Sequence, residues 1–143
     1  MSQFTIYTDG SCIPNPGPMG AAYVVLDTKD RIVTEGVESA AKGTNNIGEY
    51  TAVVIALEAV GQLSNPEETS ITIHTDSMLV INQIRGTWKV RDKTLATYHA
   101  QACLLLAAFG EWNLIHVKAH NGDRWNEYVD TNARNAAKAA VNA

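Results

Sequence analysis

Cysteine and proline are scarce in this chain of 143 residues, which contains two cysteines and four prolines. Cys12 and Cys103 lie far apart and in no metal-ligand spacing, so neither a disulfide framework nor a thiolate metal site is expected. A reduced, cytoplasmic setting is the simplest expectation for such a chain. Three of the four prolines fall within Ile13–Met19, which predicts a loop over those residues.

Long apolar runs are also missing. The longest stretches, such as Ala102–Phe109, are too short to cross a bilayer. The residues that follow Met1 do not form a basic region leading into a hydrophobic one, so no secretion signal is expected. The sequence therefore predicts no contact with a membrane.

An excess of positive charge is absent as well. The net charge is −4 and the pI is about 5.5, which argues against a protein that binds nucleic acid through a globally basic surface. A local basic patch stays possible, although a solvated surface loop explains the same cluster. Four of the eleven basic residues lie in one short segment, at Arg85, Lys89, Arg91 and Lys93.

The residues that are present are those of an ordinary folded protein. Hydrophobic residues make up 45% of the chain and charged residues 18%, which excludes a disordered chain. The length fits one domain over residues 1–143, with a core that needs no disulfide or metal to hold it. A monomer is the default expectation.

Hydrophobic periodicity predicts an α/β fold with the element order β-β-β-α-β-α-α-β-α. Three consecutive strands with short connections predict an antiparallel meander, and the later β-α alternation predicts parallel strands. The whole is then a mixed five-stranded sheet with helices on both faces. The expected strands are Phe4–Thr8, Ala21–Leu26, Arg31–Val37, Ser70–Thr75 and Trp112–Val117, and the expected helices are Asn46–Leu63, a short one after Ser77 that reaches Arg85, Leu95–Phe109 and a final one from Trp125.

Four acidic residues are the candidates for chemistry, although each has an ordinary structural explanation. Short-range turn, cap and ion-pair geometry accounts for every one of them taken alone. These explanations are an Asp-Gly turn at Asp9, a capping box from Asn46 to Glu49, a helix cap at Asp76 with Ser77, and an exposed ion pair from Asp130 to Arg134.

The joint placement of the four acids is harder to explain by stability. Asp9 and Asp76 each follow a β-rich run, so both project from one sheet edge if their strands are parallel neighbours. Glu49 and Asp130 each share a helix face with small alanines, which allow a helix to approach the sheet closely. Converging carboxylates repel one another unless divalent cations neutralise them. Oxygen ligands without cysteine select Mg²⁺ or Mn²⁺ over Zn²⁺.

Four motifs carry a family resemblance over essentially the whole chain. The chain resembles type 1 ribonuclease H, and the motifs stand in the order and on the elements that this family uses. The matching segments are Thr8–Cys12 with Asn15–Pro18, Thr44–Glu49, Thr75–Ser77, and His116–His120 continuing through Asn126 to Asp130.

The resemblance implies a ribonuclease H-like fold and an endonuclease that hydrolyses the RNA strand of RNA–DNA hybrids, leaving a 5′-phosphate and a 3′-hydroxyl. It implies that Asp9, Glu49, Asp76 and Asp130 bind two Mg²⁺ ions, for which Mn²⁺ is a possible substitute, roughly 3.5–4 Å apart across the scissile phosphate. It also implies that His120 assists proton transfer or product release, where the residues alone indicate only a loop histidine.

The resemblance further implies contacts with the sugar–phosphate edge of the hybrid, through side chains or backbone. Discrimination of RNA from DNA then rests on the 2′-hydroxyl, and little sequence preference is expected. Thr44 corresponds to a position that holds a phosphate of the DNA strand. The other positions carried over are Gly10, Cys12, Asn15, Asn45, Asn46 and Gly48.

The sequence departs from many relatives between the two central helices, where they carry a basic protrusion. Trp88 and Lys89, with Arg91 and Lys93 nearby, are the candidates for a minimal replacement, although Trp88 is equally explained by packing. Met78 stands where relatives often have a glutamine that contacts RNA. Weak, salt-sensitive binding is therefore expected, with no obligatory protein partner.

Two other functions stay open at this point. One is a nuclease of related fold that acts on DNA, and the other is a hybrid-binding module with a silent site. The Asn-Pro-Gly-Pro loop and Asn45–Asn46 favour the hybrid enzyme over the first, and the presence of all four acids argues against the second.

Overall fold

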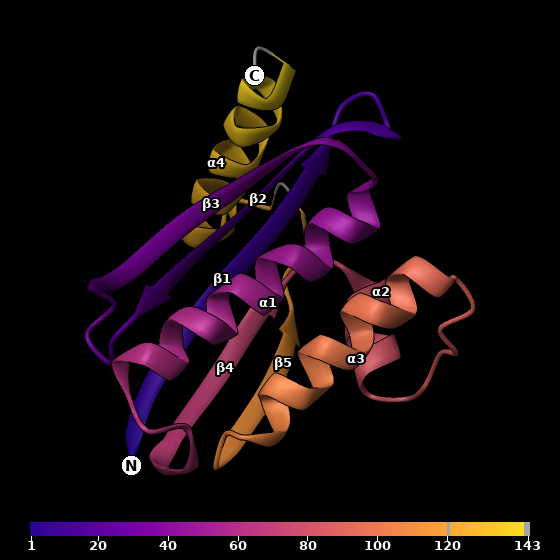
Figure 1. Ribbon diagram of the computed structural model, residues 1–143. Coiled ribbons are helices and arrows are strands. Elements are labelled where there is room, and N and C mark those ends of the chain that lie inside the picture. Colours follow the sequence, from indigo (N-terminus) through magenta and orange to yellow (C-terminus); the bar gives the residue numbers. More distant parts are fainter. Residues whose placement is uncertain (120, 142–143) are drawn as a thin grey trace.

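The computed structural model describes residues 1–119 and 121–141 (Figure 1), so His120 lies outside the described residues. Within these ranges the chain forms five strands, four α-helices and one short 3₁₀ helix, in the predicted order. The elements are β1 (Ser2–Cys12), β2 (Gly17–Leu26), β3 (Ile32–Gly43), α1 (Asn45–Leu63), η1 (Pro66–Glu68), β4 (Thr69–Thr75), α2 (Met78–Ile84), α3 (Lys93–Ala107), β5 (Glu111–His116) and α4 (Arg124–Val141).

The strands form one mixed sheet in the order β3-β2-β1-β4-β5. The pairs β1–β2 and β2–β3 are antiparallel, whereas β1–β4 and β4–β5 are parallel. This confirms the predicted meander followed by parallel strands. The parallel pairing places the carboxyl ends of β1 and β4 at the same edge of the sheet.

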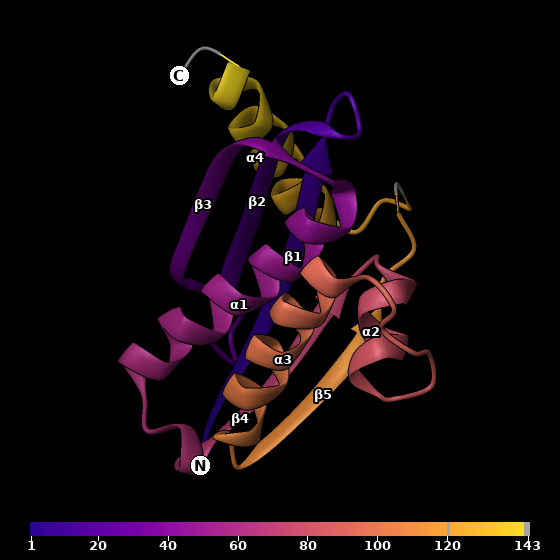
Figure 2. The same cartoon turned by 45° about the vertical axis from the view of Figure 1, so that its right-hand side comes forward.

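Helices cover both faces of the sheet, as predicted. Figures 1 and 2 show α1, α2 and α3 on one face and α4 on the other. The alternation of side chains along β1 explains the two layers, because neighbouring residues of a strand point to opposite faces. Ile6 belongs to the core under α1 and α3, and Tyr7 belongs to the smaller core under α4, where Val129 and Ala133 meet β2.

The largest differences from the expected strand boundaries are at the end of β1, at the start of β2 and at the end of β3, which continues to Gly43 instead of ending at Val37. Asp9 does not sit in a turn after the first strand, because β1 continues to Cys12 and Asp9 pairs with Ala22 of β2. The loop predicted over Ile13–Met19 is shorter, since β2 already begins at Gly17. Pro18 lies at a register shift between β2 and β3, a place where a residue without an N–H is tolerated.

The start of α1 also differs from the prediction. The N-cap is Thr44, whose Oγ1 accepts a hydrogen bond from the backbone N–H of Ile47. Asn46 is therefore inside the helix, and the capping box from Asn46 to Glu49 does not form. This correction matters for the site, because the carboxylate of Glu49 is free to contact another element.

The connection between α2 and α3 is short, since only residues 85–92 separate the two helices. This confirms that the basic protrusion of many relatives is missing. Among the described residues, no helix has the length and apolar character needed to span a membrane.

Candidate metal centre

Three of the four predicted acids meet at the carboxyl edge of β1 and β4. Asp9, Glu49 and Asp76 each offer a carboxylate oxygen, and these oxygens lie within 4.8 Å of one another. Asp9 is 3% exposed and Glu49 is 8% exposed, whereas Asp76 is half-buried. Residues from a strand, a helix and a strand–helix junction thus converge on one small volume.

Two glycines bring Glu49 to this place. A Cβ atom at Gly10 would overlap the carbonyl carbon of Gly48 and the amide nitrogen of Glu49, so only glycine allows α1 to lie this close to β1. The close approach lets the backbone N–H of Gly10 donate to Oε1 of Glu49 at 2.8 Å. Gly10 and Gly48, which the resemblance implies as substrate contacts, therefore have a packing role in this structure.

Burial and mutual repulsion set the electrostatics of the cluster. Burial raises the pKa of Asp9 far above its ordinary value, and the nearby charges of Glu49 and then Asp76 raise it further. Burial likewise raises the pKa of Glu49, against the hydrogen bonds that it accepts. A cluster of this kind holds protons when no cation is bound, and a divalent cation would replace them.

Asp130 adjoins the cluster from α4. A side-chain hydrogen bond to Asp130 contributes to the raised pKa of Asp9, so the two carboxyl groups are neighbours. Asp130 also pairs with Arg134 one helical turn later, with Nη2 2.8 Å from Oδ2. The ion pair predicted as the ordinary explanation for Asp130 thus exists together with its place beside the cluster.

The segment that contains His120 leads from β5 into α4. Its start is fixed to the edge of the cluster, because the N–H of Val117 donates to the carbonyl of Thr75 at 2.9 Å. Its end is fixed by Asp123, which accepts from the N–H groups of Trp125 and Asn126 at the start of α4. The role implied for His120 stays a prediction.

Asn15, Thr44 and Asn46, amide and hydroxyl residues of the first two motifs, lie together at the start of α1. The side chain of Asn15 accepts from the N–H of Asn45 at 3.1 Å, which joins the β1–β2 loop to the start of α1. A surface hollow of about 430 Å³ lies here. It is lined by Asn15, Pro16, Thr44, Asn46, Ile47, Asp92, Thr94 and Leu95.

Cys12 takes a different position. Its side chain is 3% exposed, and its thiol lies 3.3 Å from each of three carbonyl oxygens, those of Pro14, Gly17 and Gly43. The thiol therefore ties the proline-rich loop to the end of β3. The substrate contact that the resemblance implies for Cys12 stays a prediction.

Trp88 and Lys89 lie in the short connection between α2 and α3, and both are exposed, Trp88 by 48%. The N–H groups of Thr87 and Trp88 donate to the carbonyl of Asn82, so the connection is folded back on α2. Arg85 donates to the carbonyl of Leu114 in β5 at 2.5 Å. One of the four clustered cations thus has a structural contact, and Lys89 and Arg91 are exposed.

Sequence reasoning missed the role of Thr75. The sequence marks this threonine only as part of a motif, but its hydroxyl donates to Oε2 of Glu49 at 3.4 Å. The available signal was a hydroxyl residue at the end of a strand, directly before Asp76, and nothing in that pattern identifies its partner on a distant helix.

A family model and individual relatives both assign the chain to one family. The family model of RNase H matches residues 1–138. Ribonuclease H of Neorickettsia sennetsu is 35% identical over 99% of this chain and 97% of its own length. Ribonuclease HI of Halobacterium salinarum is 34% identical over 82% of this chain, which corresponds to 58% of that protein.

Solved structures agree in fold. The crystal structure of RNase H1 from Halobacterium salinarum superposes with a TM-score of 0.85 at 32% identity, covering 96% of this chain and 98% of that one. LC11-RNase H1, solved in complex with an RNA/DNA hybrid, gives a TM-score of 0.86 at 26% identity, covering 96% of this chain and 99% of that one. The sheet order, the acid cluster and these likenesses lead to one conclusion: the chain belongs to the RNase H family of enzymes and is of type 1.

Proposed function

We propose that this protein is a metal-dependent endonuclease that hydrolyses the RNA strand of RNA–DNA hybrids and leaves a 5′-phosphate and a 3′-hydroxyl. The observation that carries the proposal is the convergence of Asp9, Glu49 and Asp76 at one sheet edge in a chain of the RNase H family. The similar LC11-RNase H1 binds an RNA/DNA hybrid, which supports the same substrate class here.

The residues of the cluster fit Mg²⁺. All donors are carboxylate oxygens, the ligands that Mg²⁺ prefers, with Mn²⁺ as a possible substitute. Asp9 is a neighbour of Glu49 and Asp76 and also of Asp130, so it is the residue best placed to contact two ions. When bound, a pair of such ions activates the attacking water and stabilises the leaving 3′ oxygen.

The protein itself supplies position and proton handling. Glu49 is held through its carboxylate from β1 and β4, which would keep that carboxylate in one orientation for a bound cation. Arg134 balances the charge of Asp130 while no cation is bound. His120 would accept or deliver a proton near the leaving group, a role that suits an imidazole with a pKa near 6.5 in its unperturbed state.

Substrate contacts would spread from the cluster across the hollow and the α2–α3 connection. The hydroxyl and amide groups of Thr44, Asn15 and Asn46 line that hollow and suit sugar and phosphate oxygens. Trp88 and Lys89 would add a stacking surface and a phosphate contact. The enzyme would act as a monomer on the hybrid duplex.

Cleavage of matched substrates tests the proposal. A labelled RNA–DNA hybrid, an all-DNA duplex and a double-stranded RNA are incubated with the protein in Mg²⁺, and the ends of the products are identified. We expect the RNA strand of the hybrid alone to be cut, with 5′-phosphate ends. Cleavage of the DNA duplex at a similar rate would favour the alternative of a DNA nuclease.

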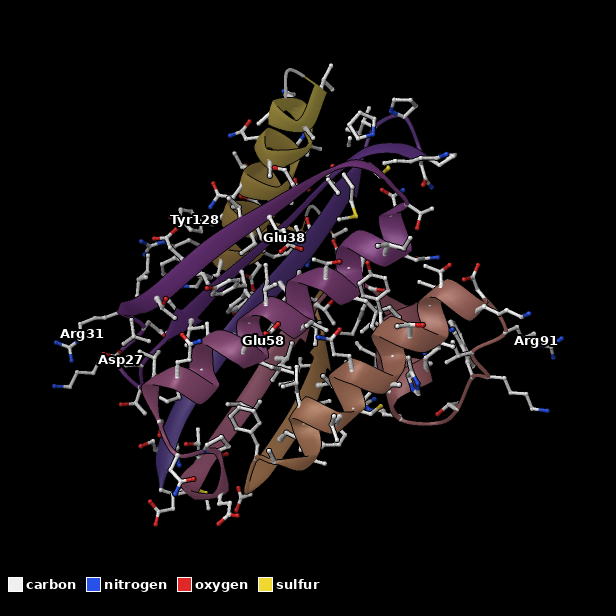
Figure 3. The ribbon with its side chains drawn as sticks, in the orientation of Figure 1. Asp27, Arg31, Glu38, Glu58, Arg91 and Tyr128 are labelled. Carbon is white, nitrogen blue, oxygen red and sulfur yellow. The ribbon has the colours of Figure 1, made fainter. Side chains whose placement is uncertain are left out.

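A pair of glutamates on α1 gives a matched test of the site. Glu49→Gln removes a buried charge of the cluster and is expected to reduce cleavage by at least about 10²-fold, the range of lost electrostatic stabilisation. Glu58→Gln makes the same change on the exposed face of α1, where Figure 3 labels Glu58, and should leave the rate unchanged. Equal activity of Glu49→Gln and the unmodified protein would exclude the proposed metal centre.

A further inference from the structure

Thr75 ends β4 and makes two hydrogen bonds, one of which reaches the acid cluster. It is 1% exposed, and its Oγ1 accepts from the backbone N–H of Ser77 at 3.1 Å. The same hydroxyl lies 3.4 Å from Oε2 of Glu49. The N–H of Ser77 can only donate, so it occupies a lone pair of the hydroxyl oxygen and leaves the hydroxyl proton of Thr75 for Oε2 of Glu49.

This bond completes a hold on Glu49 from two strands. The N–H of Gly10 in β1 binds Oε1, and Thr75 in β4 binds Oε2. The parallel neighbours β1 and β4 also carry Asp9 and lead into Asp76. Glu49 is therefore fixed relative to both other acids, against the repulsion that would otherwise turn its carboxylate away from them.

A second buried threonine shows that burial alone does not produce such a bond. Ile6 of β1 and Ile73 of β4 are partners that face the same core, so Thr8 and Thr75, each two residues on, share that face. Thr8 is 0% exposed, and its Oγ1 has no hydrogen-bond partner among the described residues. Two neighbouring threonines thus differ in whether their hydroxyl groups make a hydrogen bond to Glu49.

We propose that Thr75 is a positioning residue, which orients the carboxylate of Glu49 for divalent cations through its buried hydroxyl. The inference rests on the proposed function, because it takes the acid cluster as the cation site. Groups that orient metal ligands in this way change metal affinity or activity by about 10–100-fold when they are removed. The loss of the Thr75 hydroxyl should therefore weaken cation binding even though every carboxylate stays in place.

Three variants test this role by calorimetric titration of the nucleic-acid-free protein with Mg²⁺ and Mn²⁺. Thr75→Val keeps the shape and removes the hydroxyl, and its dissociation constant for the cation should rise by about 10-fold or more. Thr75→Ser keeps the hydroxyl and should restore binding. Thr8→Val makes the same exchange at the threonine without a partner and should bind the cation as tightly as the unmodified protein.

Hybrid cleavage adds a second readout. Thr75→Val should need more Mg²⁺ for half-maximal cleavage, and its kcat should recover when Mg²⁺ saturates the site, which a merely damaged fold would not allow. Circular dichroism checks folding, and Thr75→Ala, which adds no new methyl group, replaces Thr75→Val if that variant does not fold.

The outcomes separate the inference from the proposed function. Unchanged cation affinity in Thr75→Val, an equal loss in Thr8→Val, or no recovery in Thr75→Ser would each overturn the role of Thr75 while the metal centre stands. Unmodified protein that binds no divalent cation would overturn the proposed function, and the role of Thr75 with it.

Discussion

At the scale of one residue, burial and neighbouring carboxylates change the pKa of Asp9. Its side chain is almost completely removed from water beside Glu49 and Asp76, and burial followed by the charge of Glu49 raises its pKa. The folded protein therefore binds a proton at Asp9 more tightly than the unfolded chain does. A divalent cation bound at the cluster would displace that proton and neutralise the carboxylates.

The raised pKa of Asp9 predicts how the stability of the metal-free protein depends on pH. Protonation of Asp9 favours the folded state fully below the unfolded pKa of about 3.9, and this contribution is lost as the pH rises toward the folded pKa. We expect the free energy of unfolding in chelator to fall through this group from about pH 4 upward and to keep falling beyond pH 8, because the folded pKa is about 11. Asp9→Asn, which cannot ionise, should flatten the decline and be more stable at pH 8 by about 1–3 kcal/mol. Denaturant unfolding at several pH values measures both effects, and an Asn variant that is less stable at pH 8 would contradict the argument.

The site residues could be predicted from the sequence only where the signal was local or belonged to a motif. The pairing of Asp130 with Arg134 follows from the spacing of one helical turn, and the structure contains it. The contact of the Cys12 thiol with the carbonyl of Gly43 and the bond from Thr75 to Glu49 join residues that are far apart in the chain. Such contacts depend on how loops and helices pack, which a single sequence does not encode in any short pattern.

At the scale of elements, the close approach of α1 to β1 decides where Glu49 lies. Gly10 and Gly48 let the two backbones touch, and the bond from the N–H of Gly10 to Glu49 exists only at this separation. The smaller layer is built in the same way, since a Cβ atom at Gly20 of β2 would overlap the backbone of α4. Glycines at the contacts between the layers therefore allow α1 and α4 to lie close to the sheet, which brings together the acids of β1, α1 and α4.

Gly10→Ala tests whether the glycine at this position sets the distance between α1 and β1. The added methyl group must push the start of α1 outward, so we expect a loss of about 1–3 kcal/mol in stability and weaker Mg²⁺ binding. The matched change Gly61→Ala lies in α1 itself, where the nearest atom to the new Cβ, Cγ of Pro66, is 4.0 Å away. It should stabilise the protein by about 0.5–1 kcal/mol through helix propensity and leave the cation affinity unchanged. Thermal unfolding and cation titration measure the two variants, and equal cation affinity for Gly10→Ala and the unmodified protein would refute the idea.

The type and order of the elements could be predicted because the hydrophobic period changes clearly from strand to helix. The ends could not. Thr44 and Asn46 are both residue types that cap helices. Only the structure shows that the N-cap is Thr44, whose side chain accepts a hydrogen bond from the N–H of Ile47. The strand β1 runs beyond Asp9 because Cys12 still finds a partner in Met19, and pairing partners are invisible in the sequence of one strand.

At the scale of the whole molecule, a protein with a negative net charge has to bind a proposed substrate that is also negatively charged. The net charge is −4, and an acid cluster stands at the proposed cleavage site. Cations at the cluster offset part of this repulsion when they are bound. The rest must come from basic side chains at a distance, and the α2–α3 connection holds the exposed Lys89 and Arg91 close together in the sequence.

Binding of a hybrid in Ca²⁺, which is expected to permit binding without efficient turnover, should therefore weaken steeply with salt. Each phosphate contact contributes about 0.9 to the slope of log affinity against log salt concentration, so Lys89→Ala and Arg91→Ala should each lower the slope by about that amount.

Figure 3 shows Arg91 at the outer edge of the connection and Arg31 on the far side of the molecule, where Arg31 pairs with Asp27. Arg31→Ala makes the same charge change away from the proposed path and should leave the slope unaltered. Fluorescence anisotropy between 50 and 200 mM salt, about the range over which such contacts weaken binding strongly, measures the slopes. If Arg31→Ala and Arg91→Ala lower the slope equally, net charge governs binding, and the α2–α3 connection has no special part in holding the hybrid.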